Sequence, residues 1–249
     1  MLLKDKTALI TGCNRGIGKA ILETFAENGA DIFACVRKET EEFNERVKSL
    51  SEKNGVEIIP LCFDMRDNAA MKSAMMTIRK TRKKIDVLVN NAGMCPPTAC
   101  SFQMTPVDKI REVFDVNFFA TLQLTQYVLK FMRESGSIIN VASMAAFDGD
   151  EGFCSYAASK AALIGFTRNL SRELGKQNIR VNAVASGLTD TDMGHDHNVN
   201  GGAENFIKES TLGRWGNPKE VAGAILFLAS DLSSFVTGEV IRVKGGQRV

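Results

Sequence analysis

Ser143, Tyr156 and Lys160 are spaced so that they could act together on one chemical group. Tyr156 and Lys160 lie four residues apart in S-Y-A-A-S-K-A, and residues with this spacing share one face of a helix. A free phenol has a pKa of about 10, which is too high for acid–base catalysis near neutral pH, and an adjacent ammonium group stabilises its phenolate. Ser143 would hold a substrate carbonyl or hydroxyl group while the phenol moves its proton. The trio therefore indicates proton transfer at a carbon–oxygen bond.

The Tyr–Lys pair alone is weak evidence, because a helix with a packed tyrosine and a solvated lysine has the same spacing. The surrounding elements narrow its meaning, since apolar strand-like runs alternate with helix-like stretches. We expect strands at Thr7–Ile10, Ile32–Val36, Val56–Phe63, Ile85–Val89, Ser137–Ala142, Ile179–Val184 and Val240–Val243. We expect helices at Ile17–Asn28 and at about 39–54, 67–82, 106–133, 154–176 and 218–230. This alternation predicts one doubly wound α/β domain over residues 1–249, with a parallel sheet covered on both faces.

A glycine-rich turn follows the first expected strand, in T-G-C-N-R-G-I-G. Gly12, Gly16 and Gly18 are spaced G-x-x-x-G-x-G, which differs from the common dinucleotide pattern G-x-G-x-x-G. Glycine permits the tight turn and lets backbone N–H groups approach a pyrophosphate. The next helix begins at this point, and its dipole favours negative charge there. The strand–turn–helix order therefore favours a dinucleotide site over a plain connection.

The end of the second expected strand indicates which dinucleotide binds. A carboxylate at this place binds the 2′-hydroxyl of NAD, whereas an arginine suits the 2′-phosphate of NADP. Val36 occupies the expected carboxylate position, Arg37 and Lys38 follow it, and Arg15 lies within the glycine turn. These cations favour NADP(H) over NAD(H), although solvated side chains would give the same sequence.

The composition excludes several other classes of function. The 249 residues are 44% hydrophobic and 24% charged, as in ordinary globular proteins. The net charge is +2, and the densest basic cluster, at 80–84, is typical of the solvated end of a helix, so nucleic-acid binding is not expected. The sequence has no signal-peptide pattern and no apolar run of about 20 residues, so we expect a cytoplasmic protein without a membrane segment.

Metal binding is also not expected. The six cysteines are scattered without a C-x-x-C pair, and those in I-F-A-C-V and P-L-C-F are expected to be small buried hydrophobes. A polar loop at about 188–214 holds both histidines, His195 and His197, beside Asp192 and Asp196. A third protein ligand at recognisable spacing is missing from this group, so we predict no metal site.

Together these motifs resemble those of the short-chain dehydrogenases/reductases, especially the compact group typified by 3-oxoacyl-acyl-carrier-protein reductase. The resemblance runs from T-A-L-I-T-G to V-K-G-G. Its anchors, besides the glycine turn, are F-D-M, N-N-A-G at 90–93, D-V-N, N-V-A-S, Y-A-A-S-K at 156–160 and R-V-N-A-V-A at 180–185. The resemblance implies a single Rossmann-type domain whose seven-stranded parallel sheet has the order 3-2-1-4-5-6-7.

The resemblance also implies roles for individual residues. Ser143 would orient the substrate, and Tyr156 would be the acid–base residue. Lys160 would bind the nicotinamide ribose and favour the tyrosinate, and Asn117 would hold a water in a proton relay to Lys160. The residues implied to bind the cofactor are Gly12, Asn14, Arg15, Gly16, Ile17, Gly18, Arg37, Asp64, Met65, Asn91, Ala92, Gly93, Tyr156, Lys160, Gly187, Thr189 and Thr191.

The activity implied by the resemblance is an NADP(H)-dependent hydride transfer between nicotinamide and a carbonyl or secondary alcohol. The expected substrate is a 3-oxoacyl thioester or, alternatively, a sugar, polyol or small ketone. A non-catalytic NADP-binding sensor is disfavoured, because the catalytic set is complete. The resemblance further implies a homotetramer, and Lys130 and Arg172 match positions at which the acyl-carrier reductases dock the carrier protein.

Two departures from the family pattern bear on rate and substrate. Ser186 stands where the family usually has proline, which removes a rigid corner beside the nicotinamide. Three acidic residues, Asp148, Asp150 and Glu151, precede Tyr156. They would form either an ordinary solvated loop or an acidic rim of the substrate pocket, and an acidic rim does not suit a negatively charged carrier protein. The motifs therefore indicate the chemistry and leave the substrate open.

Overall fold

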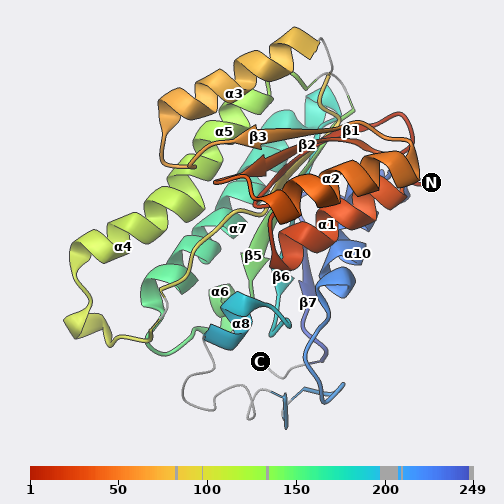
Figure 1. The fold of residues 1–249 in the computed structure, drawn as a ribbon. Helices are drawn as coiled ribbons and strands as arrows, with labels where there is room; N and C mark the ends of the chain where they lie inside the picture. Colours follow the sequence, from red (N-terminus) through yellow and green to blue (C-terminus); the bar gives the residue numbers. More distant parts are fainter. Residues whose placement is uncertain (82–83, 97, 133–134, 197–206, 209, 247–249) are drawn as a thin grey trace.

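The computed structural model describes residues 1–249 except 82–83, 97, 133–134, 197–206, 209 and 247–249. At its centre lies one sheet of seven parallel strands in the order β3-β2-β1-β4-β5-β6-β7 (Figure 1). The strands are β1 Thr7–Thr11, β2 Asp31–Val36, β3 Ile58–Cys62, β4 Val87–Asn90, β5 Ser137–Ser143, β6 Arg180–Ser186 and β7 Val240–Val243. The predicted α/β class and strand order are confirmed.

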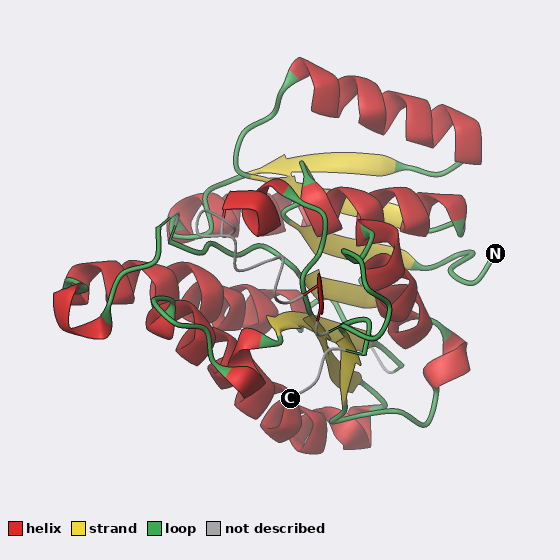
Figure 2. Ribbon diagram, turned by 90° about the horizontal axis from the view of Figure 1, so that it is seen from below, coloured by secondary structure: helices red, strands yellow, loops and turns green. Residues whose placement is uncertain are grey.

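Helices cover both faces of this sheet, as Figures 1 and 2 show. One face packs against α1 (Gly16–Glu27), α2 (Glu41–Asn54) and α10 (Pro218–Ala229). The other face packs against α3 (Asn68–Thr81), α5 (Ala120–Val128) and α7 (Cys154–Leu174). The remaining described helices are α4 (Val107–Phe114), α6 (Ala145–Asp148), α8 (Asp192–Asp196) and the short turns Phe102–Met104, Asp115–Phe119, Gly175–Gln177 and Asp231–Ser233. In the described part of the chain, no helix is long and apolar enough to cross a membrane.

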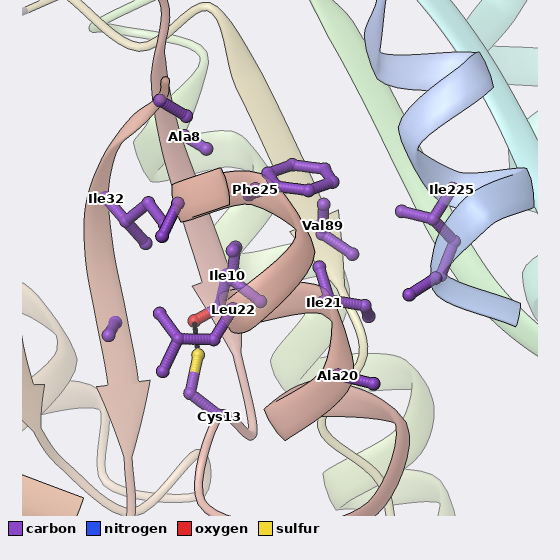
Figure 3. Close-up of a cluster of buried hydrophobic side chains, with 14 of the residues drawn as sticks. Ala8, Ile10, Cys13, Ala20, Ile21, Leu22, Phe25, Ile32, Val89 and Ile225 are labelled. Carbon is purple, nitrogen blue, oxygen red and sulfur yellow. Dashed lines mark hydrogen bonds between the residues drawn. The ribbon is translucent and has the colours of Figure 1, made fainter. Parts of the chain in front are cut away.

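Side chains of β1, α1 and α10 form the core that holds the first strand–turn–helix unit (Figure 3). Ile10, Ile21, Phe25 and Ile225 are all fully buried there. Burying one such side chain stabilises a fold by about 1.5–3 kcal/mol. The Cys13 thiol, also fully buried, donates to the carbonyl oxygen of Ile10 at 3.1 Å. The turn between β1 and α1 is therefore held in place by the packed core side chains and by the Cys13 hydrogen bond.

The helical stretch predicted at 106–133 is not one regular helix. A π-helical turn, Asp115–Phe119, joins α4 to α5, and α5 ends at Val128. The hydroxyl of Thr121 donates to the carbonyl oxygen of Asn117 at 3.0 Å, four residues earlier, and such bonds often bend helices. Residue 133 lies outside the described residues. The polar loop predicted after β6 also contains a short helix, α8.

Strand ends and one cysteine differ from the sequence-based expectations. β3 and β4 begin at Ile58 and Val87, each two residues later than predicted. Cys35 in β2 is buried as expected, but Cys62, the last residue of β3, is exposed. β3 is an edge strand, so an apolar run there does not guarantee that every side chain is covered.

Candidate functional site

The residues selected for their chemistry follow neighbouring strands of the sheet. β1 ends at the glycine turn, β4 ends before Asn91, β5 ends at Ser143 and β6 ends at Ser186. Because these strands are parallel and adjacent, their carboxyl ends lie side by side at one edge of the sheet. Ser143 and Ser186 are partners in the β5–β6 register. Open α/β sheets bind their ligands at this edge.

The glycines of the turn between β1 and α1 allow close contacts that side chains would prevent. Gly12 and Gly16 have φ values of 74° and 55°, in the left-handed region that favours glycine. A Cβ on Gly18 would lie 1.9 Å from the carbonyl oxygen of Gly12, which no side chain could tolerate. The side chain of Arg15, the residue before α1, makes no cap on the helix. This turn fits the pyrophosphate of a dinucleotide, held by backbone N–H groups.

Asn91 fastens the end of β4 to the same turn. Its side-chain amide donates to the carbonyl oxygen of Thr11 at 2.8 Å. The Thr11 hydroxyl accepts from the backbone N–H groups of Asn91 and Ala92, each at 2.9 Å. A Cβ on Gly12 would lie 2.9 Å from the amide nitrogen of Asn91. Asn91 therefore joins two strand ends that are far apart in the sequence, and its role exceeds that of a local turn cap.

Charged side chains lie at the ends of β2 and β3. Arg37 and Lys38 are exposed directly after β2. The Asp64 carboxylate accepts from the backbone N–H of Arg66 at 2.8 Å and from its guanidinium at 3.2 and 3.1 Å. Arg66, and to a smaller extent Arg37, lowers the pKa of the Asp64 carboxyl. The half-buried Met65 lies between Asp64 and Arg66. Asp64 is thus ionised at neutral pH, with Arg66 as its main partner.

The loop after β6 reaches back to the glycine turn. A Cβ on Gly16 would lie 3.2 Å from the methyl group of Thr191. Arg15 forms an ion pair with Asp192, the first residue of α8, with 3.2 Å between Nη1 and Oδ2. These contacts place Thr191 beside the glycine turn.

The corner after β6 is held without the expected proline. The backbone N–H of Met144 donates to the carbonyl oxygen of Ser186 at 2.9 Å, and that of Gly187 donates to Val243 at 2.8 Å. The hydroxyl of Thr189, a buried residue, donates to the carbonyl oxygen of Gly187 at 3.0 Å. Backbone hydrogen bonds from Met144 after β5 and to Val243 of β7 therefore hold this corner.

Asn117 lies fully buried in the π-helical turn. Its Oδ1 accepts from the backbone N–H of Met94 at 2.8 Å, and its Nδ2 donates to the carbonyl oxygen of Met94 at 2.9 Å. Nδ2 also donates to the hydroxyl of Ser159 at 3.0 Å, which in turn donates to the carbonyl oxygen of Tyr156 at 2.8 Å. Asn117 thus ties the segment after β4 to the helix that carries Tyr156 and Lys160. Such π-helical turns often occur at functional sites.

Ser143, at the end of β5, lowers the pKa of the Tyr156 phenol in the first turn of α7, so the two side chains interact. Burial nevertheless raises the pKa of this phenol above its usual range, and Ser143 only partly opposes the shift. The Lys160 ammonium lies 5.7 Å from the centroid of the Tyr156 ring. The stabilisation of the phenolate expected from Lys160 is therefore outweighed by burial, and the phenol is neutral at physiological pH.

Lys160 is itself buried, with 4% of its surface exposed. Its Nζ donates to the carbonyl oxygen of Val141 at 2.8 Å and lies 3.3 Å from where a Cβ on Gly93 would be. Burial lowers the pKa of Lys160 to about 8. A side chain at position 93 would therefore press against the ammonium, which would have to shift. Val141 and Ser159 stand within the anchors N-V-A-S and Y-A-A-S-K, but the sequence analysis gave neither a role in the site. A motif does not show which backbone carbonyl or hydroxyl a buried side chain will contact.

The lowered pKa of Lys160 predicts a pH-dependent stability. The pKa is about 8 in the folded chain and about 10.4 in an unfolded one. The unfolded chain therefore binds more protons between these values, so folding becomes more favourable as the pH rises through that window. Below pH 8 the burial of the ammonium costs about 3 kcal/mol. The original chain should therefore gain stability between pH 7 and pH 10.5, whereas Lys160→Met should not gain this contribution. In urea titrations, the unfolding free energy of Lys160→Met relative to that of the original chain should fall by about 2–3 kcal/mol over this range. A constant difference would contradict this pKa.

Cys95 also belongs to this site, although the sequence analysis did not select it. Burial, and then the Asp150 charge, raises the pKa of its thiol, and the Lys160 ammonium opposes the rise. Cys95 acts in turn on the pKa of the Tyr156 phenol. The available signal was its position, two residues after the N-N-A-G segment.

The polar loop shows a different arrangement from a metal site. His195 Nε2 lies 2.8 Å from Asp190 Oδ1, and the His195 ring stacks on Trp215 with 4.6 Å between centroids. Among the described residues, no group of three His, Cys, Asp or Glu side chains could hold a metal ion. His197 lies outside the described residues.

Comparison with known proteins adds the family context. Residues 12–248 match the model of a family described as enoyl-(acyl carrier protein) reductase. The chain is 38% identical over 256 residues to the 3alpha-hydroxysteroid dehydrogenase of Mediterraneibacter gnavus, covering 100% of this chain and 99% of the relative. It is 40% identical over 249 residues to the 3-oxoacyl-[acyl-carrier-protein] reductase of Thermotoga maritima, covering 99% of each. A similar solved structure comes from Beutenbergia cavernae, contains bound NADP and is described as that of a putative NAD(P)-dependent gluconate 5-dehydrogenase. Its TM-score is 0.89 and its sequence identity is 32%, with 98% of this chain and 97% of that chain covered.

Proposed function

The chain belongs to the short-chain dehydrogenase/reductase family, and within that family we propose that Tyr156 is the acid–base residue of an NADP(H)-dependent reaction. The protein is an oxidoreductase that acts on C=O and CH–OH groups with a nicotinamide dinucleotide. The observation that carries the proposal is the position of the buried Lys160, whose ammonium lies 5.7 Å from the centroid of the Tyr156 ring. These groups lie at the sheet edge that also bears the glycine turn.

A nicotinamide cofactor, when bound, supplies or accepts the hydride. The backbone of the glycine turn would hold its pyrophosphate, and Asp64 and Met65 would contact its adenine. Lys160, which already lies against Gly93, would bind the ribose next to the nicotinamide. The other residues proposed to line the cofactor are Asn14, Ile17, Asn91, Ala92, Gly187, Thr189 and Thr191.

Tyr156 and Ser143 act on the substrate oxygen. Each hydroxyl would donate a hydrogen bond to the carbonyl oxygen of the substrate. As negative charge develops on that oxygen during reduction, the neutral phenol transfers its proton to it. Lys160, whose pKa is about 8, is suited to return a proton to the phenolate near neutral pH. Asn117 would hold the water of this relay, in the place fixed by its bonds to Met94 and Ser159.

We propose NADP(H) as the cofactor because Val36 occupies the carboxylate position at the end of β2 and two cations follow it directly. Arg37 and Lys38 are exposed there, and Arg15 lies in the glycine turn. We expect NADPH to bind more tightly than NADH, and Arg37→Gln to weaken NADPH binding by about tenfold without changing NADH binding. Fluorescence titration of the purified chain measures both affinities. Arg79→Gln is the matched control, since Arg79 is an exposed arginine of α3. Equal affinities for the two nucleotides in the original chain would reject NADP(H) as the preferred cofactor.

The substrate proposed first is a 3-oxoacyl thioester, as in the Thermotoga maritima relative. Lys130 and Arg172 are exposed and available to dock an acyl carrier protein. A sugar, polyol or small ketone is the second candidate, favoured by the acidic residues before Tyr156. A panel of these carbonyl compounds, with loss of reduced-nicotinamide absorbance as readout, tests the function.

We also propose a cytoplasmic homotetramer, on the strength of the family resemblance. Phe119, in the π-helical turn before α5, is 56% exposed and would be covered by a second copy. A monomer in light scattering at micromolar concentration would contradict this assembly.

A further inference from the structure

Arg46, a residue of α2 that no motif includes, contacts the glycine turn. α2 lies beside α1, the helix that begins at this turn (Figure 1). The Arg46 guanidinium donates from Nη1 to the carbonyl oxygen of Asn14 at 2.9 Å. Only 12% of the Arg46 side chain is exposed. Because the donor is charged and largely withdrawn from solvent, it holds the Asn14 carbonyl in one direction more firmly than a neutral donor would.

Contacts within α2 fix the place of Arg46. Phe43, one turn before it, is fully buried in the core that α2 shares with α1. The Thr40 hydroxyl caps the start of α2 by accepting from the N–H of Phe43 at 3.2 Å. Glu42, four residues before Arg46, forms an ion pair with Nη2 of the guanidinium. Such pairs are common on solvated helices, but here the other nitrogen, Nη1, reaches the glycine turn.

The bond from Arg46 also determines where the next N–H group points. The carbonyl of Asn14 and the N–H of Arg15 belong to one peptide unit, which is planar and trans. The N–H of Arg15 therefore points away from Arg46. Within the described part of the chain, no group accepts a hydrogen bond from this N–H. Arg15 directly precedes α1, at the end of a helix where backbone N–H groups bind anions.

We propose that Arg46 is a positioning residue for the dinucleotide, which holds the peptide unit between Asn14 and Arg15 so that the Arg15 N–H faces the pyrophosphate. This inference rests on the proposed function, because it takes the glycine turn as the pyrophosphate site. A reversed peptide unit would present the Asn14 carbonyl oxygen, which repels phosphate oxygens. Gly16, whose φ is 55°, follows this unit and restrains it little, because glycine has the widest conformational freedom. The restraint therefore comes from outside the turn, through Arg46.

Arg46→Met tests the proposal, since methionine keeps an apolar stem and removes the guanidinium. NADPH and NADH share the pyrophosphate, so both should bind more weakly by the same factor, about tenfold, as when one hydrogen bond to a charged group is lost. Fluorescence titration measures both affinities. KM for NADPH should rise by a similar factor while kcat at saturating NADPH stays within about twofold, whereas a general loss of structure would lower kcat as well. Unchanged affinities, or a loss for NADPH alone, would overturn the proposal.

Glu42→Gln is the matched control, because its amide oxygen can still accept from Arg46 while one charge is removed. It should leave both affinities within about twofold of the original values. If charge alone attracted the nucleotide, Glu42→Gln would strengthen binding about as much as Arg46→Met weakens it, and that result would also overturn the proposal. Arg46→Gln carries the same expectation as Arg46→Met and takes its place if the methionine variant fails to fold.

Limited digestion with trypsin gives a second readout that needs no nucleotide. The protease can cut after Arg15 only when the turn opens locally. We expect Arg46→Met to speed this cleavage by about fivefold, and Glu42→Gln to leave its rate unchanged. Mass spectrometry of the new chain end at Gly16 reports the rates, with cleavage after the exposed Arg79 as internal reference. An unchanged rate in Arg46→Met would reject the role of Arg46 and leave the proposed function intact. Failure of the original chain to bind either nucleotide, beside faster cleavage in Arg46→Met, would instead reject the proposed function.

Discussion

Tyr156→Phe is expected to lower kcat/KM for NADPH-dependent carbonyl reduction by about a thousandfold, while the affinity for NADPH stays within about twofold. The substitution removes the hydroxyl that we propose as proton donor and keeps the ring beside Lys160. Ser143 would still hold the carbonyl oxygen, but an aliphatic hydroxyl is too weak an acid to replace the phenol. Initial rates of NADPH consumption give the first quantity, and fluorescence titration gives the second.

Tyr127→Phe is the matched control for this experiment, since Tyr127 is the other tyrosine of the chain. Its hydroxyl donates to Asn68 Oδ1 at 2.7 Å, between α5 and the start of α3. Its loss should cost about 1 kcal/mol of stability and leave activity unchanged. Near-normal activity in Tyr156→Phe, or an equal loss in both variants, would refute the role assigned to Tyr156.

Gly18→Ala is expected to abolish measurable nucleotide binding and to destabilise the fold by about 3 kcal/mol. The added Cβ would lie 1.9 Å from the carbonyl oxygen of Gly12 and 2.6 Å from the Asn91 amide nitrogen. Neither group can yield easily, because Gly12 belongs to the turn and Asn91 is bonded to Thr11. The turn must therefore open, which displaces the N–H groups proposed to hold the pyrophosphate. Chemical unfolding and NADPH titration measure the two effects.

Gly223→Ala serves as the control for the glycine substitution. Gly223 lies within α10, and a Cβ there would meet no atom within 4 Å. Alanine has the higher helix propensity, so this variant should be as stable as the original chain or more stable by up to about 1 kcal/mol. If Gly18→Ala behaves like Gly223→Ala, the close approach of Gly18 to Gly12 is not essential for the turn.

The fold could be predicted largely because its signals are local. Buried parallel strands such as β1 read as continuous apolar runs, and Gly12, Gly16 and Gly18 mark the turn after it. The strand order came from the resemblance to a family, since no local pattern specifies which strands are neighbours. The strand ends were predicted less accurately, since β3 and β4 each begin two residues after the start of the apolar run.

The geometry within the site was harder to predict, since it depends on contacts between distant segments. The π-helical turn around Asn117 has no sequence signature, yet it lets the Asn117 amide reach Met94 and Ser159. The sequence led us to expect that Lys160 lowers the pKa of the Tyr156 phenol. This direction was wrong, because burial raises that pKa. The spacing of Tyr156 and Lys160 indicates that the two side chains lie together. Their pKa values depend on how far each side chain is buried, which the spacing does not show.

The most direct test of the account is turnover of a carbonyl panel by the purified chain with NADPH, followed by the absorbance of the reduced nicotinamide. The panel contains a 3-oxoacyl thioester, sugars, a steroid ketone and small ketones. We predict that at least one ketone is converted to its alcohol in amounts equal to the NADPH consumed, and that Tyr156→Phe abolishes this conversion. Tight NADPH binding without consumption on any member of the panel would contradict the account.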